Sequence, residues 1–147
     1  MRKRTQGREC ALQMLYQHEL NAVPLPELYE DFWCQNPEHS ADVKSFSELL
    51  VRGTVTNLEH INQIISKYAE NWQLSRMAVI DRSILRFATF ELLYCDDIPP
   101  KVTINEAVNI AKKFSQEDSG KFVNGILDKI SHSETTKDPS PSEADSL

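Results

Sequence analysis

Apolar residues recur with the period of an α-helix along most of this chain, and no segment shows the strict alternation of a half-buried strand. The clearest case is SRMAVIDRSILRFATFELLYC, residues 75–95, whose apolar residues cover most of a helical circumference. A helix that is apolar nearly all round has to be covered by other elements on most sides. The sequence therefore predicts an all-α fold built around this segment, with Ser75 as its N-cap.

Capping residues and helix breakers divide the chain before this segment. Thr5 is predicted to cap a first helix that ends near residue 20. Two prolines, Pro24 and Pro26, end that helix and suit the first turn of the next one. A long helical stretch then reaches about Trp72, with a break expected over residues 53–57, because Gly, Thr and Asn are poor helix formers.

Two further helices are expected after the central segment. Thr103 and Glu106 have the spacing of a capping box, in which each side chain satisfies a backbone donor at the other end of the turn. The last helix is expected to begin at Ser115 or Asp118 and to end near Ile130. With the earlier segments this gives about six to seven helices.

The composition changes sharply near residue 131. The stretch 132–147 is rich in Ser, Pro, Thr and acidic residues and contains almost nothing apolar. Such a segment cannot bury enough surface to offset the entropy of ordering it. We therefore expect one helical domain over residues 1–131 and a disordered acidic tail over residues 132–147.

Composition also limits the environment and the partners. The chain of 147 residues fits one domain, and its net charge of -6 argues against a generally basic coat protein for nucleic acid. It leaves room for local binding, which depends on a patch rather than on the sum. The three cysteines do not suggest a disulfide framework, and no apolar run is long enough to span a membrane. A soluble protein of the cytoplasm is expected, with no membrane partner.

Motifs for catalysis or metal binding are missing from the sequence. It contains no P-loop, no CxxC pair and no GxSxG elbow, and its four histidines have no recognised metal-ligand spacing. Nothing therefore favours an enzyme, a bound cofactor or a metal site.

The first eight residues carry four cations: Arg2, Lys3, Arg4 and Arg8. A solvated start is the commoner role of such a short run. Cations at a helix N-terminus, however, oppose the helix dipole by about 0.3–1 kcal/mol each, and this favours an external anionic partner such as phosphate.

A second cation lies beside an aromatic ring at Lys121 and Phe122, in the polar junction before the last helix. A cation and a ring can serve a single-stranded nucleic acid, one for phosphate and one for base stacking. Helix-start amides add to this, whereas Asp118 opposes a phosphate nearby. By residue type alone, a core phenylalanine and a solvated lysine are the favoured interpretation.

Three segments carry a family resemblance. INEAVNIAKKFSQEDSGKFVNGILDKI, preceded by IPPKV, resembles the C-terminal signature of the NusB family of bacterial transcription antitermination factors. VIDRSILRFATFELLY resembles the central helix of that family, and RECALQMLYQHEL resembles its first helix. The resemblance covers Arg8 to Ile130, matches poorly over residues 24–42, and does not include the acidic tail.

The resemblance implies an all-helical fold of two packed three-helix halves and no catalysis. It implies binding of boxA, a short single-stranded RNA element near the start of ribosomal RNA transcripts. The partner would be the small-subunit ribosomal protein that acts as Nus factor E. Together they would join an assembly on RNA polymerase that suppresses premature termination.

The resemblance also implies roles for particular residues. Positions matching the RNA-contacting surface of the family are Arg2, Lys3, Arg4, Arg8, Lys121 and Phe122, with Asp118 tuning RNA affinity. Positions matching its protein-partner surface are Tyr16, Tyr68, Arg76 and Asp81. Within the signature, Glu106 is interpreted as a cap and Gly125 as a site of close packing.

The sequence suggests two alternative functions. One is an RNA cytosine methyltransferase, because a NusB-like domain precedes the catalytic domain in such enzymes; the expectation is against it, since no cofactor-binding domain with catalytic cysteines follows. The other is a helical protein-protein adaptor without direct RNA binding, in which the basic start serves solubility only.

Overall fold

The computed structural model describes residues 2–70 and 73–135, and this part of the chain contains seven α-helices, one 3₁₀ turn and no strand. The expected all-α fold is confirmed. The predicted disorder of the tail beyond Thr135 and the predicted role of Trp72 lie outside the described residues. The chain divides into two compact units, Met1–Thr56 (unit 1) and Asn57–Leu147 (unit 2).

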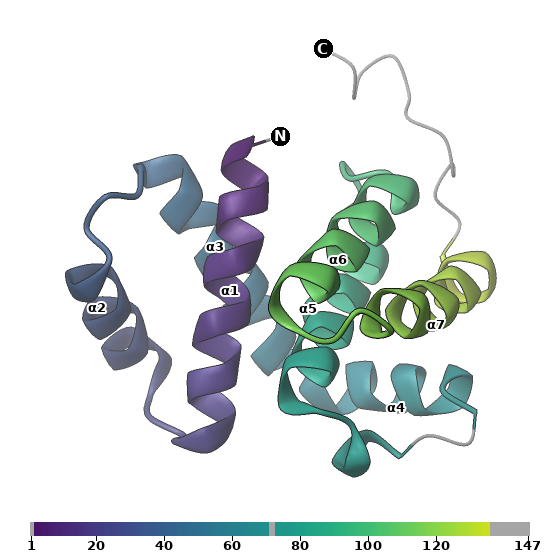
Figure 1. The fold of residues 1–147 in the computed structure, drawn as a ribbon. Helices are drawn as coiled ribbons and strands as arrows, with labels where there is room; N and C mark the ends of the chain where they lie inside the picture. The colour runs from purple at the N-terminus through teal and green to yellow at the C-terminus, as the bar shows by residue number, and fades with distance from the viewer. Residues whose placement is uncertain (1, 71–72, 136–147) are drawn as a thin grey trace. The chain divides into compact units, whose positions relative to one another are not determined.

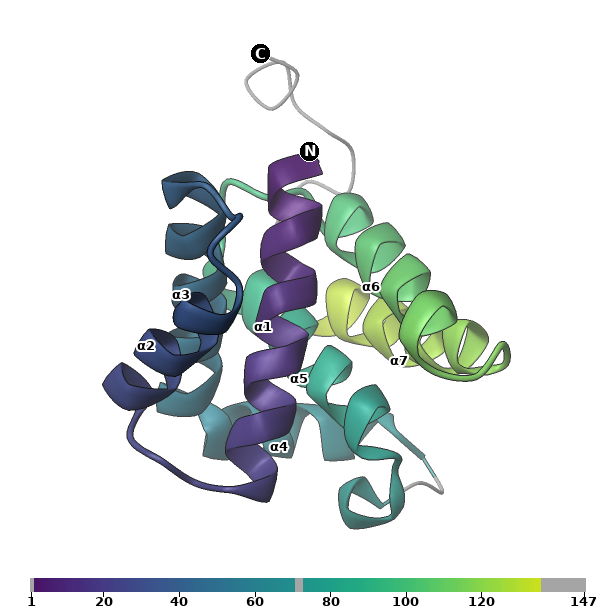
Figure 2. The same cartoon turned by 60° about the vertical axis from the view of Figure 1, so that its left-hand side comes forward.

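Unit 1 contains α1 (Arg2–Leu20), α2 (Leu25–Gln35) and α3 (Ala41–Thr56). The first and third helices lie side by side in Figure 1 and Figure 2, and α2 contacts both. Pro24 is at the N-cap position of α2 and Pro26 is in its first turn, as the sequence predicted. Thr5 as an N-cap is wrong, because α1 already begins at Arg2.

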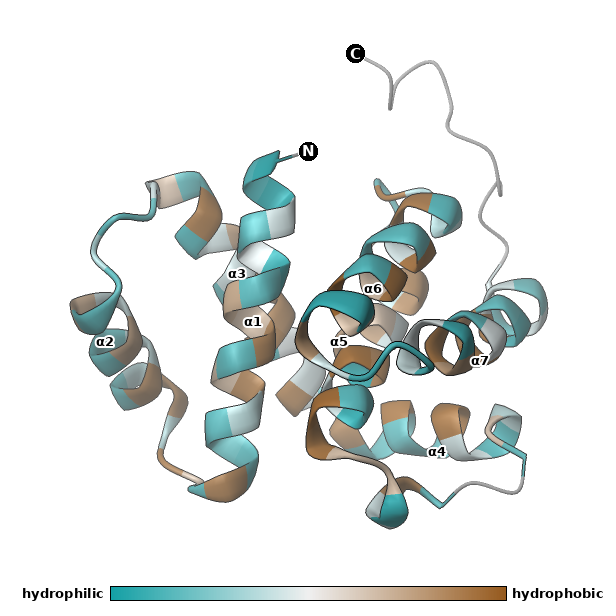
Figure 3. Cartoon of the chain, in the orientation of Figure 1, coloured by the Kyte–Doolittle hydropathy of each residue, from teal (hydrophilic) through white to brown (hydrophobic). Residues whose placement is uncertain are grey.

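Unit 2 contains α4 (Leu58–Tyr68), the 3₁₀ turn η1 (Leu74–Arg76), α5 (Val79–Tyr94), α6 (Pro100–Phe114) and α7 (Ser119–Glu134). This half therefore has four α-helices rather than three. The predicted central segment is confirmed, since α5 contacts α4, α6 and α7. Its Ile84, Leu85 and Phe87 have no exposed surface. Hydrophobic and hydrophilic residues alternate along α4 and α7, as amphipathic helices require (Figure 3).

Of two helix boundaries predicted in the middle of the chain, one is confirmed and the other is wrong. The predicted break over residues 53–57 is confirmed, because α3 ends at Thr56 and α4 begins at Leu58. Ser75 as the N-cap of α5 is wrong. It lies in η1, and α5 begins only at Val79. The guanidinium of Arg82 donates to the carbonyl of Met77 across 2.7 Å and so holds the end of this turn against α5.

The capping box at Thr103 and Glu106 is also wrong. The sixth helix begins earlier, at Pro100, whose fixed φ suits a first turn and whose missing N–H has no partner to lose there. Thr103 is fully buried instead, and its hydroxyl donates to Oε1 of the equally buried Glu91 across 2.9 Å. The side chain that resembled a cap therefore joins α6 to α5.

The last helix ends later than expected. It continues three residues beyond position 131, to Glu134. Gly125 on its exposed side is not a site of close packing, because a Cβ added there would meet nothing within 4 Å.

Candidate RNA and partner-protein interface

The first turn of α1 carries a basic cluster formed by Arg2, Lys3 and Arg4. Arg2 and Lys3 are exposed. The Lys3 ammonium forms an ion pair with Asp42 across 3.2 Å, and the two side chains are 65% and 77% exposed. An ion pair this exposed is weak, so it leaves Lys3 able to exchange Asp42 for a phosphate.

Arg4 stands over a ring from another helix. Its guanidinium lies 5.0 Å from the centroid of the Phe46 ring on α3. Gly7 permits this approach, since a Cβ at that position would lie 2.8 Å from Cδ2 of Phe46. The glycine and the ring thus fix the basic first turn of α1 against α3.

Arg8 differs from the other predicted cations. It has no exposed surface, and its guanidinium lies 5.3 Å from the centroid of the same Phe46 ring. A fully buried side chain cannot touch a phosphate in solvent without leaving its place. The structure therefore gives Arg8 a packing role beneath the basic cluster.

A second site lies where η1, α5 and α7 meet, in a pocket of about 410 Å³ that we call the junction pocket. It is lined by residues from all three elements and the segments between them: Arg76, Met77, Ala78, Asp81, Gln116, Asp118, Ser119 and Phe122. It brings together four residues predicted from the sequence, two from each predicted surface. The expected RNA site and the expected partner site are thus contiguous here.

Hydrogen bonds on one side of the junction pocket place its acidic group. The hydroxyl of Ser119 donates to Oδ2 of Asp81 across 3.1 Å, and the hydroxyls of Ser119 and Ser115 lie 3.0 Å apart. Within the described part of the chain, Oδ1 of Asp81 is buried without a hydrogen-bond partner. One carboxylate oxygen is therefore held by Ser119, while the other is shielded from solvent, so a ligand reaches it only after the Asp81 side chain rotates.

The start of α7 combines opposite charges. Asp118 occupies the N-cap position but its side chain makes no capping hydrogen bond, and it is exposed. Lys121 is exposed and Phe122 half-buried on the next turn. Since Asp118 is not used as a cap, its main electrostatic effect is to repel an anion near the helix start.

The other predicted partner residues lie elsewhere. Tyr16 on α1 is 38% exposed. Tyr68 at the end of α4 donates its hydroxyl to Oε2 of Glu134 on α7, which also accepts from Lys67 across 3.1 Å. These contacts hold the pKa of the Glu134 carboxyl below its usual range and raise the pKa of Lys67. Tyr68 therefore closes the end of α7 against α4.

Some residues of these sites were not found from the sequence. Ser119 adjoins Asp118, and its suitability as a helix-start residue was a usable signal. Phe46 gave no such signal, because it lies on another helix from the arginines it supports.

Two other kinds of feature are absent from the described residues. Over residues 2–70 and 73–135, no three His, Cys, Asp or Glu side chains are grouped closely enough to hold a metal ion. Across the same residues, none of the helices has the length and apolar character needed to cross a membrane.

Comparisons with known proteins agree with the resemblance seen in the sequence. The model of the NusB family matches residues 5–132. The transcription antitermination protein NusB of Thermodesulfovibrio yellowstonii is 47% identical, covering 90% of this chain and 93% of its own. That of Geobacter sulfurreducens is also 47% identical, covering 88% and 94% respectively.

Solved structures give the same result. NusB of T. maritima superposes with a TM-score of 0.80 at 41% identity, covering 88% of this chain and 91% of that one. A crystal structure of the antitermination factors NusB and NusE in complex with dsRNA contains a chain with a TM-score of 0.82 at 29% identity. The match covers 90% of this chain and 98% of that one.

Proposed function

The chain belongs to the NusB family of transcription antitermination proteins, and from this we propose that it binds single-stranded boxA RNA together with a small-subunit ribosomal protein acting as Nus factor E. In this proposal the pair joins the RNA polymerase complex in the bacterial cytoplasm and promotes processive transcription of ribosomal RNA operons. The similar chain in the crystal structure of the antitermination factors NusB and NusE in complex with dsRNA supports an RNA partner and a NusE-type protein partner.

The observation that carries the proposal is the composition of the junction pocket. An aromatic ring, a cation and two carboxylates line one hollow of the surface: Phe122, Arg76, Asp81 and Asp118. A ring can stack on an unpaired base, which is how proteins read single-stranded RNA. The carboxylate of Asp81 lines the same pocket, and its negative charge suits a basic group of a protein partner.

The basic cluster supplies the phosphate contacts in this proposal. Arg2, Lys3 and Arg4 on α1 and Lys121 on α7 are the four cations assigned to phosphate, while buried Arg8 supports them from below. For single strands each phosphate contact changes the log-log salt slope of binding by about -0.7, so four contacts predict a slope of about -2.8. The net charge of -6 implies modest affinity alone, raised when a basic partner adds its surface.

The test is a fluorescence anisotropy titration of labelled boxA RNA and of a scrambled RNA with the full chain. Wild type should prefer boxA. Phe122→Ala should weaken boxA binding by about tenfold, since stacking on one ring is worth about 1–3 kcal/mol. Phe122→Leu keeps apolar packing but removes the ring, and it should weaken boxA binding as well while leaving helicity intact.

The alternative function, an adaptor without RNA contact, makes a different prediction for the same titration. It requires equal, weak binding of boxA and scrambled RNA by wild type. It also requires no change in either affinity on replacing Phe122.

A further inference from the structure

A second groove lies between α6 and α7 and shares no lining residue with the junction pocket. Its volume of about 420 Å³ falls within the range of about 300–1,000 Å³ typical of small-ligand sites. Nine residues line this α6–α7 groove: Pro100, Lys101, Ile104, Asn105, Asn124, Asp128, Ser131, His132 and Thr135.

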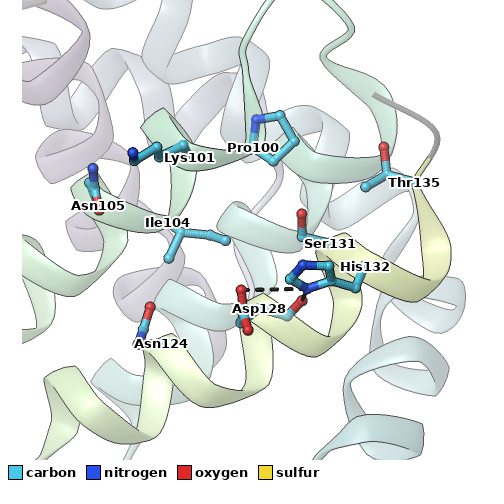
Figure 4. Close-up of a pocket in the computed structure, with 9 residues that line it drawn as sticks. All are labelled: Pro100, Lys101, Ile104, Asn105, Asn124, Asp128, Ser131, His132 and Thr135. Carbon is cyan, nitrogen blue, oxygen red and sulfur yellow. Dashed lines mark hydrogen bonds and ion pairs between the residues drawn. The ribbon is translucent and has the colours of Figure 1, made fainter. Parts of the chain in front are cut away.

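Side chains of different chemistry occupy the two ends of the groove (Figure 4). One end holds two carboxamides and an ammonium group, from Asn105, Asn124 and Lys101. The other end holds two hydroxyls and an imidazole, from Ser131, Thr135 and His132. The side chain of Ile104 lies between them and is 9% exposed, so it offers a ligand a small apolar contact.

The two carboxamides are available for a ligand. Asn105 and Asn124 are exposed, and across the described residues neither side-chain amide has a hydrogen-bond partner. A carboxamide presents a donor and an acceptor side by side, the arrangement that pairs with the edge of a nucleobase. Two such groups from facing helices match the polar edge of an unstacked base better than they match an apolar protein side chain.

Charge in the groove sets the orientation of such a ligand. Oδ1 of Asp128 lies 3.5 Å from Nδ1 of His132, which also lies 2.8 Å from the Asp128 carbonyl oxygen. This carboxylate repels a phosphate from the middle of the groove and can accept from the exocyclic amino group of a base. Lys101 at the rim is the group suited to a phosphate.

We propose that the α6–α7 groove binds one unstacked nucleotide of a single-stranded RNA. The base edge faces Asn105 and Asn124, the base lies beside Ile104, and Lys101 contacts the flanking phosphate. This inference rests on the proposed function, since it supposes that the RNA is the one bound at the junction pocket. It adds a second point of base recognition on unit 2.

The test combines protein variants with altered RNA in anisotropy titrations of the full chain. The double variant Asn105→Ala/Asn124→Ala should bind boxA RNA about tenfold more weakly than wild type. Asn109→Ala/Gln63→Ala removes two exposed amides that line neither site and should bind as wild type does. Lys101 adds a fifth phosphate contact to the four assigned above, so wild type should then show a salt slope of about -3.5 and Lys101→Ala about -2.8, whereas Lys129→Ala should leave the slope unchanged.

Abasic substitution locates the nucleotide. In a set of boxA RNAs that each lack a different base, one RNA should bind wild type more weakly than intact boxA does. The double asparagine variant should bind that RNA and intact boxA equally, because the contact is already lost. If the affinity lost on removing each base is the same for wild type and for the variant, the two asparagines contact no base and the proposal is overturned. An asparagine variant that binds RNA normally but binds the ribosomal protein weakly would also overturn it.

The two proposals fail in different ways. Loss of boxA preference in wild type would overturn both. If wild type prefers boxA and Phe122→Ala weakens binding while the asparagine variant is unchanged, only the groove proposal is overturned.

Discussion

The hydroxyl of Ser119 donates a hydrogen bond to the carboxylate of Asp81 across 3.1 Å and joins the first residue of α7 to the first turn of α5. The Asp81 side chain also lines the junction pocket, and its second oxygen is buried without a hydrogen-bond partner in the described part of the chain. Asp81 therefore has two separable roles, one in holding α7 and one in facing a ligand.

Replacing Asp81 separates those roles. Asp81→Asn keeps an acceptor for Ser119, so it should leave the stability of the fold nearly unchanged. It should weaken binding of the ribosomal protein. Asp81→Lys should weaken binding of the ribosomal protein by more than about tenfold, because it places a cation where a basic partner docks. Calorimetric titration with the ribosomal protein measures the affinity of both variants. Glu30→Lys on α2 is the control, because it makes the same change of charge elsewhere. Unchanged affinity of Asp81→Lys would refute this role.

Removing the charge of Asp118 should tighten RNA binding. Its carboxylate is exposed, makes no capping bond, and lies one turn from Lys121. The gain expected for Asp118→Asn is about twofold to fivefold, the size of an exposed charge interaction of up to about 1 kcal/mol. A gel-shift titration with boxA RNA measures it, with Asp96→Asn as the control for net charge. Weaker binding by Asp118→Asn would contradict the prediction.

Two glycines in helices should respond oppositely to alanine. Gly7→Ala should lower the free energy of unfolding by about 1 kcal/mol or more, since strain against the Phe46 ring outweighs the better helix propensity of alanine. Gly125→Ala meets nothing and should raise it by up to about 1 kcal/mol. Urea unfolding compares the two. Equal stabilisation by both would mean that Phe46 moves aside freely.

Two buried threonines on neighbouring helices offer a similar contrast. Thr103→Val removes the donor to the buried Glu91 carboxylate and should cost about 1–3 kcal/mol of stability. Thr89 is as buried, but its hydroxyl has no hydrogen-bond partner among residues 2–70 and 73–135. Thr89→Val should therefore be neutral or stabilising. Thermal unfolding monitored by circular dichroism measures the stability of both variants, and an equal loss of stability in the two would contradict the prediction.

The contacts of Glu134 predict a dependence of stability on pH. The hydroxyl of Tyr68, and after it Lys67, holds the pKa of Glu134 below its usual value of 4.5. The folded state thus binds this proton less readily than the unfolded state. The stabilisation is complete above pH 4.5 and is lost as the pH falls through the lowered pKa.

Unfolding curves of wild type and Glu134→Gln should therefore differ at neutral pH and converge under acid conditions. Glu59→Gln, which removes an exposed carboxylate from α4, should show no such convergence. A gap between wild type and Glu134→Gln that is constant down to pH 3 would disprove the role of the ionised carboxylate.

The sequence predicted the helices well and several of their first residues badly, for different physical reasons. Burial of an apolar stripe requires helical spacing over many residues, so the central position of α5 was readable from its own composition. A cap depends on one side chain, which a distant partner can capture. Thr103 donates its hydroxyl to Glu91 on another helix instead of capping its own. Thr5 lies inside α1, because the contact of Arg4 with Phe46 supports a turn that begins before it.

The candidate sites were predictable only in part. The types of residue in the junction pocket followed from the family resemblance. Their adjacency did not, because it depends on the contact of Ser119 with Asp81, which lies 38 residues away in the sequence. Nor could charge alone indicate which of the early cations is buried; Arg8 is, because Gly7 admits the Phe46 ring beside it.

Each unit consists of one uninterrupted stretch of chain, and this has a consequence for biosynthesis. All contacts among α1, α2 and α3 can form once Thr56 has left the ribosome, before any residue of unit 2 is available. Contacts between helices close in sequence also form quickly, since little loop-closure entropy opposes them. The nascent chain can thus bury the apolar face of unit 1 during translation, which shortens the time in which that face can aggregate.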